Sequence, residues 1–315
     1  MAQFGLIGAA GYIAPRHMKA IKDTGNQLLA ALDPFDSVGI IDSFFPDADF
    51  FIEPERFDRH LDKLRRTGKS AIDYVSICSP NFLHDSHIRM ALRNQSNAVC
   101  EKPLVLNPWN IDALAQIEKE TGKRIFNILQ LRHHPAVTKL KKKIDQANPE
   151  KIFDIDLTYI TSRGAWYFYS WKGDIQKSGG IATNIGIHFF DMLAWIFGEP
   201  TQNIVHLNDG HKAAGFLQLK KARVRWYLSV DRKDLPAEIA KKGQYTFRSI
   251  KVDGEEFEFS GGFTDLHTRT YENILKGNGF GLDATRTSIV IAHEIRNLSP
   301  SAPKGEYHPM IKMKD

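Results

Sequence analysis

Apolar and polar residues alternate along the first 129 residues in blocks of strand length and helix length. Short apolar runs are found at 3–8, 28–32, 44–52, 72–76, 98–100 and 124–129. Between them apolar residues recur every three or four positions, as at Met18 and Ile21 or at Phe57 and Leu61. Buried runs separated by amphipathic helices are typical of a parallel sheet covered on both faces. The pattern predicts a doubly wound α/β domain over residues 1–129.

The pattern changes from residue 130 onward. Residues 152–161 alternate between apolar and polar side chains, which indicates a strand with one covered face. Similar runs lie at 215–219, 224–230, 245–250 and 256–259, and helical patterns lie at 181–197 and 285–298. We predict a second α/β domain over residues 130–315, with an open, mainly antiparallel sheet. Its last residues, 299–315, are expected to form an extended tail.

Residues 97–104, which read NAVCEKPL, carry the most informative chemistry of the first domain. Glu101, Lys102 and Pro103 follow directly after an apolar run that we predict to be a buried strand. Ligands of open α/β sheets bind in the crevice outside the carboxyl ends of the strands. Lys102 is therefore the first candidate for a catalytic residue.

A glycine turn connects the first predicted strand to the first predicted helix, with the sequence GAAGYIA starting at Gly8. Gly8 and Gly11 can adopt backbone angles that other residues disfavour, and Ala10 lets the turn stay close to the strand. Tyr12 and Ile13 belong to the same turn. Main-chain amides at the start of such a helix can hold a pyrophosphate. The spacing is a variant of the dinucleotide fingerprint, and a tight turn without a ligand is the alternative.

Asp33 ends the second apolar run, at the distance from the glycines that the dinucleotide fingerprint requires. A carboxylate at this position accepts hydrogen bonds from ribose hydroxyls and repels a 2'-phosphate. This favours NAD over NADP. The alternative is that Asp33 is only a turn residue before Pro34.

Composition and charge exclude several classes of protein. With 315 residues, 42% hydrophobic and 25% charged, the chain fits two globular domains and is neither disordered nor fibrous. The net charge of +5 is compatible with anionic ligands. The lysine cluster at 139–143 is interpreted as an exposed helix face, because it lacks interleaved aromatic residues, and no nucleic acid partner is expected.

Cysteine usage and hydropathy point to the cytoplasm. Cys78 and Cys100 both fall on predicted core strands, where a reduced thiol behaves as a small apolar side chain. Neither a disulfide nor a metal site is expected. No uninterrupted apolar stretch has the length that a bilayer span needs, and the chain enters its first strand without a signal-like segment. We expect a cytoplasmic protein with no membrane partner.

A second group of candidate residues lies at 179–191, where two glycines open an apolar helix. Asn184 and His188 are four residues apart and share a face of that helix, and Asp191 follows one turn later. A lone histidine on an apolar helix is usually a hydrogen-bonded core residue. Because Lys102 needs an acid-base partner, His188 is nevertheless the second catalytic candidate.

These motifs resemble, in their order, those of the Gfo/Idh/MocA oxidoreductases: the glycine turn, the Ser79-Pro80-Asn81 turn followed by His84, Glu101-Lys102-Pro103, and the helix at 179–191. The resemblance covers nearly the whole chain. It implies an N-terminal Rossmann domain that binds NAD and a C-terminal α/β domain whose open sheet commonly mediates oligomerisation. It also implies that Lys102 binds the reacting hydroxyl and that His188 is the acid-base residue.

The same resemblance assigns cofactor contacts to residues of each motif. The expected NAD-binding residues are Gly8, Ala10, Gly11, Tyr12, Ile13, Asp33, Ser79, Asn81, His84, Glu101, Lys102 and Gln130, with Trp171 packing near the cofactor.

Within the family, the chain is most similar to members that oxidise the 3'-hydroxyl of UDP-2-acetamido-2-deoxy-D-glucuronate in bacterial surface-polysaccharide synthesis, such as that of lipopolysaccharide O-antigen. The similarity lies in residues 8–17, in QLRHHP at 130–135 and in residues 163–180. Some of these members recycle NADH with 2-oxoglutarate. The resemblance also implies a homo-oligomer, a tetramer or a dimer. Asn184 stands where many family members have aspartate, which leaves Lys102 and His188 as the titratable pair.

The loop at 162–178 is the expected wall of the sugar site. An anionic substrate suits arginine forks and lysine point charges, so we expect Arg163 and Lys177 to contact anionic groups, beside Tyr167. Substrate contacts are also expected for Lys102, Asn184 and His188. The alternative for this loop is an ordinary surface loop with packed aromatic residues.

Other interpretations stay open at this point. A dehydrogenase of a free sugar or inositol would share Lys102 and His188 without needing a pyrophosphate site. A non-catalytic NAD-sensing protein would have no need of either residue. Arg132, His133 and His134 follow a strand end and are candidates to reach the crevice, and the alternative is that His133 or His134 simply starts the next helix before Pro135.

Overall fold

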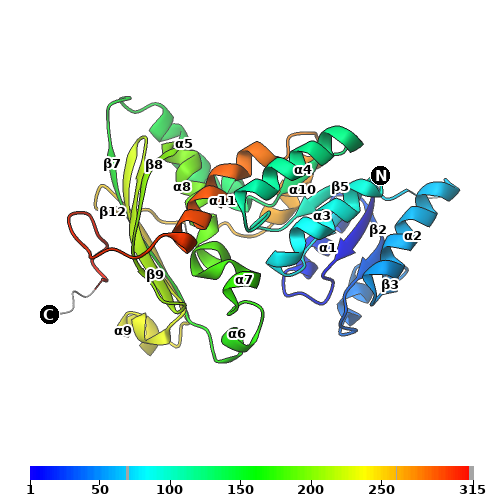
Figure 1. Cartoon of the computed structure of the whole chain (residues 1–315), viewed down its shortest axis with the longest axis horizontal. Helices are drawn as coiled ribbons and strands as arrows, with labels where there is room; N and C mark the ends of the chain where they lie inside the picture. Colours follow the sequence, from blue (N-terminus) through cyan, green and yellow to red (C-terminus); the bar gives the residue numbers. More distant parts are fainter. Residues whose placement is uncertain (69–70, 260, 312–315) are drawn as a thin grey trace. The chain divides into compact units, whose positions relative to one another are not determined.

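The computed structural model describes residues 1–68, 71–259 and 261–311, which belong to two compact units (Figure 1). The first unit consists of Met1–His133 and Phe263–Arg286, and the second of His134–Gly262 and Thr287–Asp315. The predicted division after residue 129 differs from this in two respects, because the first unit continues to His133 and Phe263–Arg286 returns to it. Residues 312–315 of the predicted tail lie outside the described residues.

The first unit is built on a parallel sheet with the strand order β3-β2-β1-β4-β5-β6. Its strands are β1 (Gln3–Ile7), β2 (Gln27–Leu32), β3 (Asp49–Phe51), β4 (Tyr74–Ile77), β5 (Asn97–Cys100) and β6 (Ile125–Asn127). Every neighbouring pair in this order runs parallel. This is the strand order of the dinucleotide-binding doubly wound fold. The predicted Rossmann fold is confirmed.

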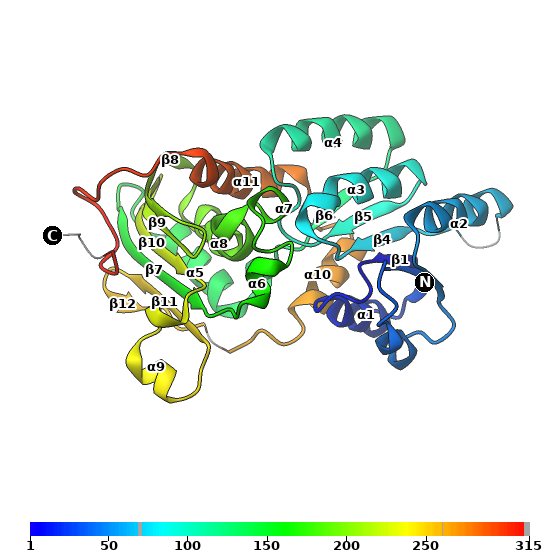
Figure 2. The same ribbon diagram turned by 60° about the horizontal axis from the view of Figure 1, so that its bottom comes forward.

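Helices cover both faces of this sheet. They are α1 (Ala14–Asp23), α2 (Pro54–Thr67), α3 (His84–Arg93), α4 (Pro108–Thr121) and α10 (Leu266–Leu275). Figure 2 shows α1 and α10 on one face and α3 and α4 on the other. Met18 and Ile21 of α1 share one apolar cluster with Tyr271 and Ile274 of α10 and with Phe4 of β1. This packing is the reason why α10 belongs to the first unit.

Several predicted strands are shorter in the structure than the apolar pattern suggested, among them those at 44–52, 124–129 and 256–259. Of the predicted run at 44–52, only Asp49–Phe51 pairs as a strand, and Phe44 follows the 3₁₀ helix Gly39–Ser43. Pro46 lacks the amide hydrogen that a strand residue donates, which explains the late start. Of the run at 256–259, only β12 (Glu255–Glu256) is a strand.

The second unit contains a mixed sheet with the order β12-β11-β7-β10-β9-β8. Besides β12, its strands are β7 (Phe153–Thr161), β8 (Pro200–Asn208), β9 (Lys212–Leu219), β10 (Ala222–Ser229) and β11 (Thr246–Val252). β7 and β10 run parallel and the other pairs are antiparallel, so the mainly antiparallel prediction is confirmed. The pattern missed β8, because register shifts within it break the two-residue period.

The two faces of this sheet differ sharply in character. On one face α8 (Ile187–Phe197) packs on the strands, with Phe190 against Trp226 at a ring distance of 5.4 Å. On the other face Asp154 pairs with Arg223 at 2.7 Å and Asp156 pairs with Arg225 at 2.6 Å. The alternation predicted for β7 is therefore confirmed.

The remaining helices of this unit are α5 (Pro135–Asp145), α6 (Trp166–Tyr169), α7 (Ile175–Ser178), α9 (Ala237–Lys241) and, from residue 287 on, α11 (Leu282–Asn297).

One helical stretch of the described residues, Ile175–Phe197, is long and apolar enough to cross a membrane by length and composition alone. Its most apolar window is 83% buried inside the protein, as expected for a core helix. The sequence-based expectation counted only uninterrupted apolar runs. An averaged window tolerates Asn184, His188 and Asp191, which is why the two criteria differ.

Candidate active site

The glycine turn after β1 fits a dinucleotide. Gly8 has a φ of +89°, and a Cβ there would lie 2.6 Å from the main-chain carbon of Cys78. Only glycine can therefore hold the turn this close to the end of β4. The amide of Gly11 donates to the carbonyl oxygen of Gly8 at 3.0 Å, and α1 begins three residues later. Tyr12 is 89% exposed, so its side chain is accessible to a ligand.

Asp33 lies at the end of β2 and faces the same turn. Its Oδ2 accepts a hydrogen bond from the amide of Ala10 at 2.9 Å, and its Oδ1 accepts one from the amide of Phe35 at 2.9 Å. The side chain is buried. Asp33 thus joins the glycine turn to the segment after β2, and its carboxylate is held where the fingerprint places a ribose contact.

The turn after β4 is tied to the segment that follows Lys102. The ring of His84 lies between the carbonyl oxygens of Ser79 and Pro103, with nitrogen-to-oxygen distances of 2.8 and 2.7 Å. Burial lowers the pKa of His84. The hydroxyl of Ser79 also contacts His87 Nδ1 at 2.8 Å, and Asn81 is buried beside it. Since both ring nitrogens of His84 face main-chain oxygens, this histidine positions the two turns, and its direct contact with a cofactor stays a prediction.

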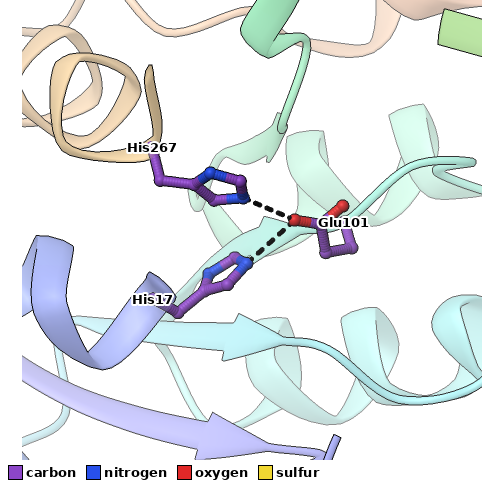
Figure 3. Close-up of side chains that lie close together, drawn as sticks. All are labelled: His17, Glu101 and His267. Atoms are coloured by element: carbon purple, nitrogen blue, oxygen red, sulfur yellow. Dashed lines mark hydrogen bonds and ion pairs between the residues drawn. The ribbon is translucent and has the colours of Figure 1, made fainter. Parts of the chain in front are cut away.

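Glu101 lies at the end of β5 and is the centre of a buried polar cluster (Figure 3). His17 of α1 and His267 of α10 each place Nε2 at 3.0 Å from the same oxygen, Oε1 of Glu101. The ligand-type atoms of these three side chains lie within 4.8 Å of one another, a set that could hold a metal ion. The hydrogen-bond distances account for their approach without one.

Lys102 directly follows this cluster and is half-buried. Its main-chain amide donates to Oε2 of Glu101 at 3.2 Å. The structure therefore places the predicted catalytic lysine at the carboxyl end of a central strand, where ligands of this fold bind. Its catalytic role stays a prediction.

The four residues described after β6 each serve the fold in a different way. Gln130 begins the 3₁₀ helix Gln130–His133 and is half-buried. Arg132 donates to the carbonyl oxygen of Ala284 at 2.7 Å. His133 stacks on Phe280 at a ring distance of 5.1 Å, and burial lowers its pKa. His134 caps α5 by accepting from the amide of residue 136 at 3.2 Å. For His134, the helix-start interpretation is the one that the structure supports.

In the second unit, Asn184 and His188 lie where a π-helical turn meets an α-helix. Asn184 belongs to the turn Ala182–Gly186 and His188 to α8. Asn184 is buried and donates from Nδ2 to the hydroxyl of Tyr167 at 2.9 Å. His188 is half-buried, and Asp191 is buried one turn further. Single π-turns inside helices occur frequently at functional sites.

The same turn holds a residue that sequence reasoning missed. Thr183 is buried, and among the described residues its Oγ1 has no hydrogen-bond partner. A buried hydroxyl in this state is usually completed by water or a ligand. Its position next to Asn184 in the glycine-led helix is the only sequence signal that could have singled it out.

The loop at 162–178 carries the other predicted substrate residues. Tyr167 is buried and holds Asn184, while Arg163 and Lys177 are exposed. The Nζ atom of Lys177 lies 3.8 Å from Oδ2 of Asp174. Lys172 belongs to the predicted wall of the sugar site but was not singled out for anionic groups, and its Nζ lies 4.7 Å from the ring centre of Trp171. Burial, followed by the nearby charge of Arg163, lowers the pKa of Lys172.

Lys172 also lines a pocket that lies within the second unit. The pocket has a volume of about 350 Å³, and its lining includes Tyr167, Asn208, Arg296 and Ser299. Burial lowers the pKa of Arg296. Two half-buried cations in one pocket favour an anionic ligand. Tyr167 connects this pocket to Asn184 and so to the helix that carries His188.

Comparison with known proteins matches this chain over both units. Two family models match: "Oxidoreductase family, NAD-binding Rossmann fold" over residues 2–128 and "Oxidoreductase family, C-terminal alpha/beta domain" over residues 141–294. The crystal structure of the WlbA (WbpB) dehydrogenase from Thermus thermophilus in complex with NAD and alpha-ketoglutarate is 52% identical, with a TM-score of 0.95. That match covers 99% of this chain and 100% of the other.

A second structure of the Thermus thermophilus enzyme, in complex with NAD and UDP-GlcNAcA, is 51% identical with a TM-score of 0.95 and the same coverage. Among curated proteins, the inositol 2-dehydrogenase of Rhizobium meliloti is 28% identical over 203 residues, which are 64% of this chain and 57% of that enzyme. The chain thus matches little more than half the length of this curated relative.

Proposed function

The chain belongs to the Gfo/Idh/MocA family of NAD-dependent oxidoreductases, and from this premise we propose that it oxidises the 3'-hydroxyl of UDP-2-acetamido-2-deoxy-D-glucuronate to the 3-keto sugar. The observation that carries the proposal is the 51% identity, over the full length, to a dehydrogenase crystallised with NAD and UDP-GlcNAcA. The residues that the mechanism needs, Lys102, Asn184 and His188, are all present.

We assign the chemical roles as follows. His188 removes the proton of the 3'-hydroxyl, and Lys102 donates a hydrogen bond to the oxygen as negative charge develops on it. Asn184, oriented by Tyr167, holds the sugar but cannot take a proton. NAD, when bound, accepts the hydride. The glycine turn, Asp33, Ser79, Asn81, His84, Glu101 and Gln130 are proposed to hold or position the cofactor, with Trp171 packing near it.

Anionic groups of the substrate are proposed to meet the cations of the 162–178 loop. Arg163, Lys177 and the pocket residue Lys172 supply positive charge beside Tyr167, which suits a diphosphate and a hexuronate carboxylate. The half-buried position of Lys172 makes it the strongest of the three candidates, because a cation partly removed from water gains most from an anion.

The relative crystallised with alpha-ketoglutarate supports a second half-reaction. We propose that 2-oxoglutarate takes the hydride back from NADH, so that 2-hydroxyglutarate forms and NAD is regenerated. We further propose that the enzyme works in the cytoplasm as a homotetramer and supplies a keto sugar for lipopolysaccharide O-antigen or a related surface polysaccharide.

A second candidate function is the dehydrogenation of a free inositol or sugar. The identity of 28% to an inositol 2-dehydrogenase favours it, and such an enzyme would use the same Lys102 and His188. It would not need the cationic pocket beside Tyr167. A non-catalytic NAD-sensing protein has less support, since both catalytic candidates are retained.

The test is NADH formation by the purified protein with UDP-2-acetamido-2-deoxy-D-glucuronate, with UDP-N-acetylglucosamine and with myo-inositol. Each substrate is assayed with and without 2-oxoglutarate, and 2-hydroxyglutarate is measured in parallel. Oxidation of the uronate and not of its uncharged counterpart supports the proposal. Oxidation of myo-inositol alone would replace the proposal with the second candidate.

A further inference from the structure

The cluster around Glu101 joins three segments that are far apart in the sequence. His17 lies on α1, Glu101 at the end of β5 and His267 on α10, and all three side chains are buried. Figure 3 shows both histidine rings pointing at the same carboxylate oxygen. The proposed reaction gives no role to either histidine. The function of this buried cluster, which directly precedes the proposed catalytic residue Lys102, is therefore not explained by the proposed reaction.

The direction of each hydrogen bond follows from the chemistry of its atoms. An ionised carboxylate only accepts, so both histidines donate from Nε2 to Oε1 of Glu101. The Nδ1 atom of a neutral His17 is then an acceptor, and the hydroxyl of Tyr271 donates to it at 2.7 Å. Ser76 completes the chain by donating to the hydroxyl oxygen of Tyr271 at 2.6 Å.

The protonation states agree with these directions. Burial would raise the pKa of Glu101, but the hydrogen bonds from His17 and His267 overcome it and hold the pKa well below its usual value. Burial lowers the pKa of His17 and raises that of Tyr271, so both are neutral. With His17 and Tyr271 neutral, Glu101 is the ionised group of this chain of hydrogen bonds and places a negative charge inside the first unit.

The second oxygen of Glu101 extends the cluster to the predicted catalytic residue. Oε2 accepts from the main-chain amide of Lys102 at 3.2 Å. A protonated Glu101 would accept all three contacts more weakly, because hydrogen bonds to an ionised acceptor are roughly twice as strong as those to a neutral one. The charge on Glu101 therefore fixes the turn that carries Lys102.

We propose that His17 and His267 are positioning residues for the reaction: their two hydrogen bonds keep Glu101 a carboxylate, which in turn holds the main chain of Lys102. This inference rests on the proposed function for the role of Lys102. The charge of Arg16 on α1 acts on His17. The charge of Glu101 in turn acts on four neighbouring titratable groups: Cys78 after β4, His84 on α3, Cys100 on β5 and Tyr271 on α10.

The experiment compares two replacements at each histidine. His17→Gln and His267→Gln keep a side-chain N–H donor, whereas His17→Leu and His267→Leu keep the volume and remove the donor. In the leucine variants burial still raises the pKa of Glu101 but fewer donors oppose it. In the wild type the proposed base, His188, sets the acid limb of kcat/KM. In the leucine variants Glu101 must also be deprotonated, so we expect that limb to become steeper and to move up by about one pH unit or more. The glutamine variants are expected to stay near the wild type.

Tyr271→Phe is the second variant, for use where a leucine replacement fails to fold. It removes only the hydroxyl that orients the ring of His17, and a smaller shift of the acid limb in the same direction is expected. Equal acid limbs in the wild type, the leucine variants and Tyr271→Phe would overturn the proposal. So would equal shifts in the leucine and glutamine variants, because packing alone explains that result.

A second readout separates this proposal from the proposed function. Thermal unfolding is followed against pH without any substrate. Near neutral pH the leucine variants are expected to be less stable than the glutamine variants, because their buried carboxylate has lost a donor. Acidification is expected to cost the leucine variants less stability, because Glu101 takes up its proton more readily in their folded state. If the wild type oxidises none of the tested sugars, the proposed function fails while the unfolding series still tests the charge on Glu101. If the wild type oxidises the UDP-uronate but the leucine and glutamine variants behave alike in both readouts, the positioning role fails and the proposed function stands.

Discussion

At Gly8 the identity of a single residue decides whether the first turn can form. Its φ is positive, and the space that a Cβ would need is taken by the main chain of Cys78. Gly25 also has a positive φ, but no atom lies within 4 Å of its missing Cβ. The two glycines therefore separate the effect of backbone strain from the effect of a steric clash.

Gly8→Ala is expected to cost about 2 kcal/mol or more of unfolding free energy and to abolish NAD binding, because the turn must move away from β4. Gly25→Ala is the matched control and is expected to cost about 1 kcal/mol with NAD binding retained. Chemical denaturation and NAD titration measure the two quantities. Similar losses at both sites would show that the clash at Gly8 is relieved at little cost.

Lys102 and His188 carry the proposed proton chemistry. Lys102→Met and His188→Asn are each expected to lower kcat by about a hundredfold or more, since each removes a group that acts on the reacting hydroxyl. Lys142→Met, on the exposed face of α5, is the control for loss of a lysine. Steady-state kinetics with the UDP-uronate, together with NAD titration of each variant, provide the measurement. Full turnover in either catalytic variant would remove the mechanism.

At the scale of elements, the periodicity of apolar residues predicted the helices and strands that depend on local contacts. It missed an element whose packing depends on residues far away in the sequence. The strands and helices of the first domain were found because each shows its own period, as at Met18 and Ile21 of α1. The helix α10 was not predicted, although Leu266, Thr270 and Ile274 recur at helical spacing. Its burial comes from a sheet formed more than a hundred residues earlier, and nothing near it in the sequence signals that partner.

The same limit applies to the candidate site. The motif residues Gly8, Asp33 and Lys102 could be found because strand ends and glycine turns have local signatures. His267 could not be connected to Glu101 in this way, because their contact joins α10 to β5. Thr183 was missed, and Lys172 was not singled out within the predicted wall, for a similar reason, since burial and pocket lining depend on how the chain folds.

The loop at 162–178 permits a test of the cationic pocket. Lys172→Met keeps the aliphatic stem over Trp171 and removes the charge. We expect the KM for the UDP-uronate to rise about tenfold with little change in kcat, because the contacted group does not react. Lys172→Arg should restore most of the affinity. An unchanged KM in Lys172→Met would exclude this pocket from substrate binding.

At the scale of the whole molecule, buried histidines make both units sensitive to acid. Burial lowers the pKa of His87 in the first unit and that of His308 in the second to about 4. Between pH 6.5 and about 4 each of these histidines stays neutral in the folded state, whereas the same histidine takes up a proton in the unfolded chain. Stability from these groups is therefore present above the unfolded pKa of 6.5 and is lost as the pH falls from there toward 4.

Acidification below about pH 6.5 is expected to lower the unfolding temperature progressively, with a contribution of up to about 3 kcal/mol from each of the two histidines. The double variant His87→Gln/His308→Gln should flatten this loss, whereas His211→Gln, at an exposed position, should not. Thermal unfolding at a series of pH values measures the effect. A double variant as acid-sensitive as the wild type would assign the loss to other groups.

The return of residues 263–286 to the first unit also determines when that unit can fold during protein synthesis. His267, Tyr271 and Ile274 complete its core and its buried charge cluster, yet they leave the ribosome only after all of residues 134–262. At typical rates of translation this delay is on the order of 10 s. The nascent Rossmann sheet must therefore wait with one face covered only in part, by α1, which makes the interval before α10 emerges the stage at which chaperone binding would matter most.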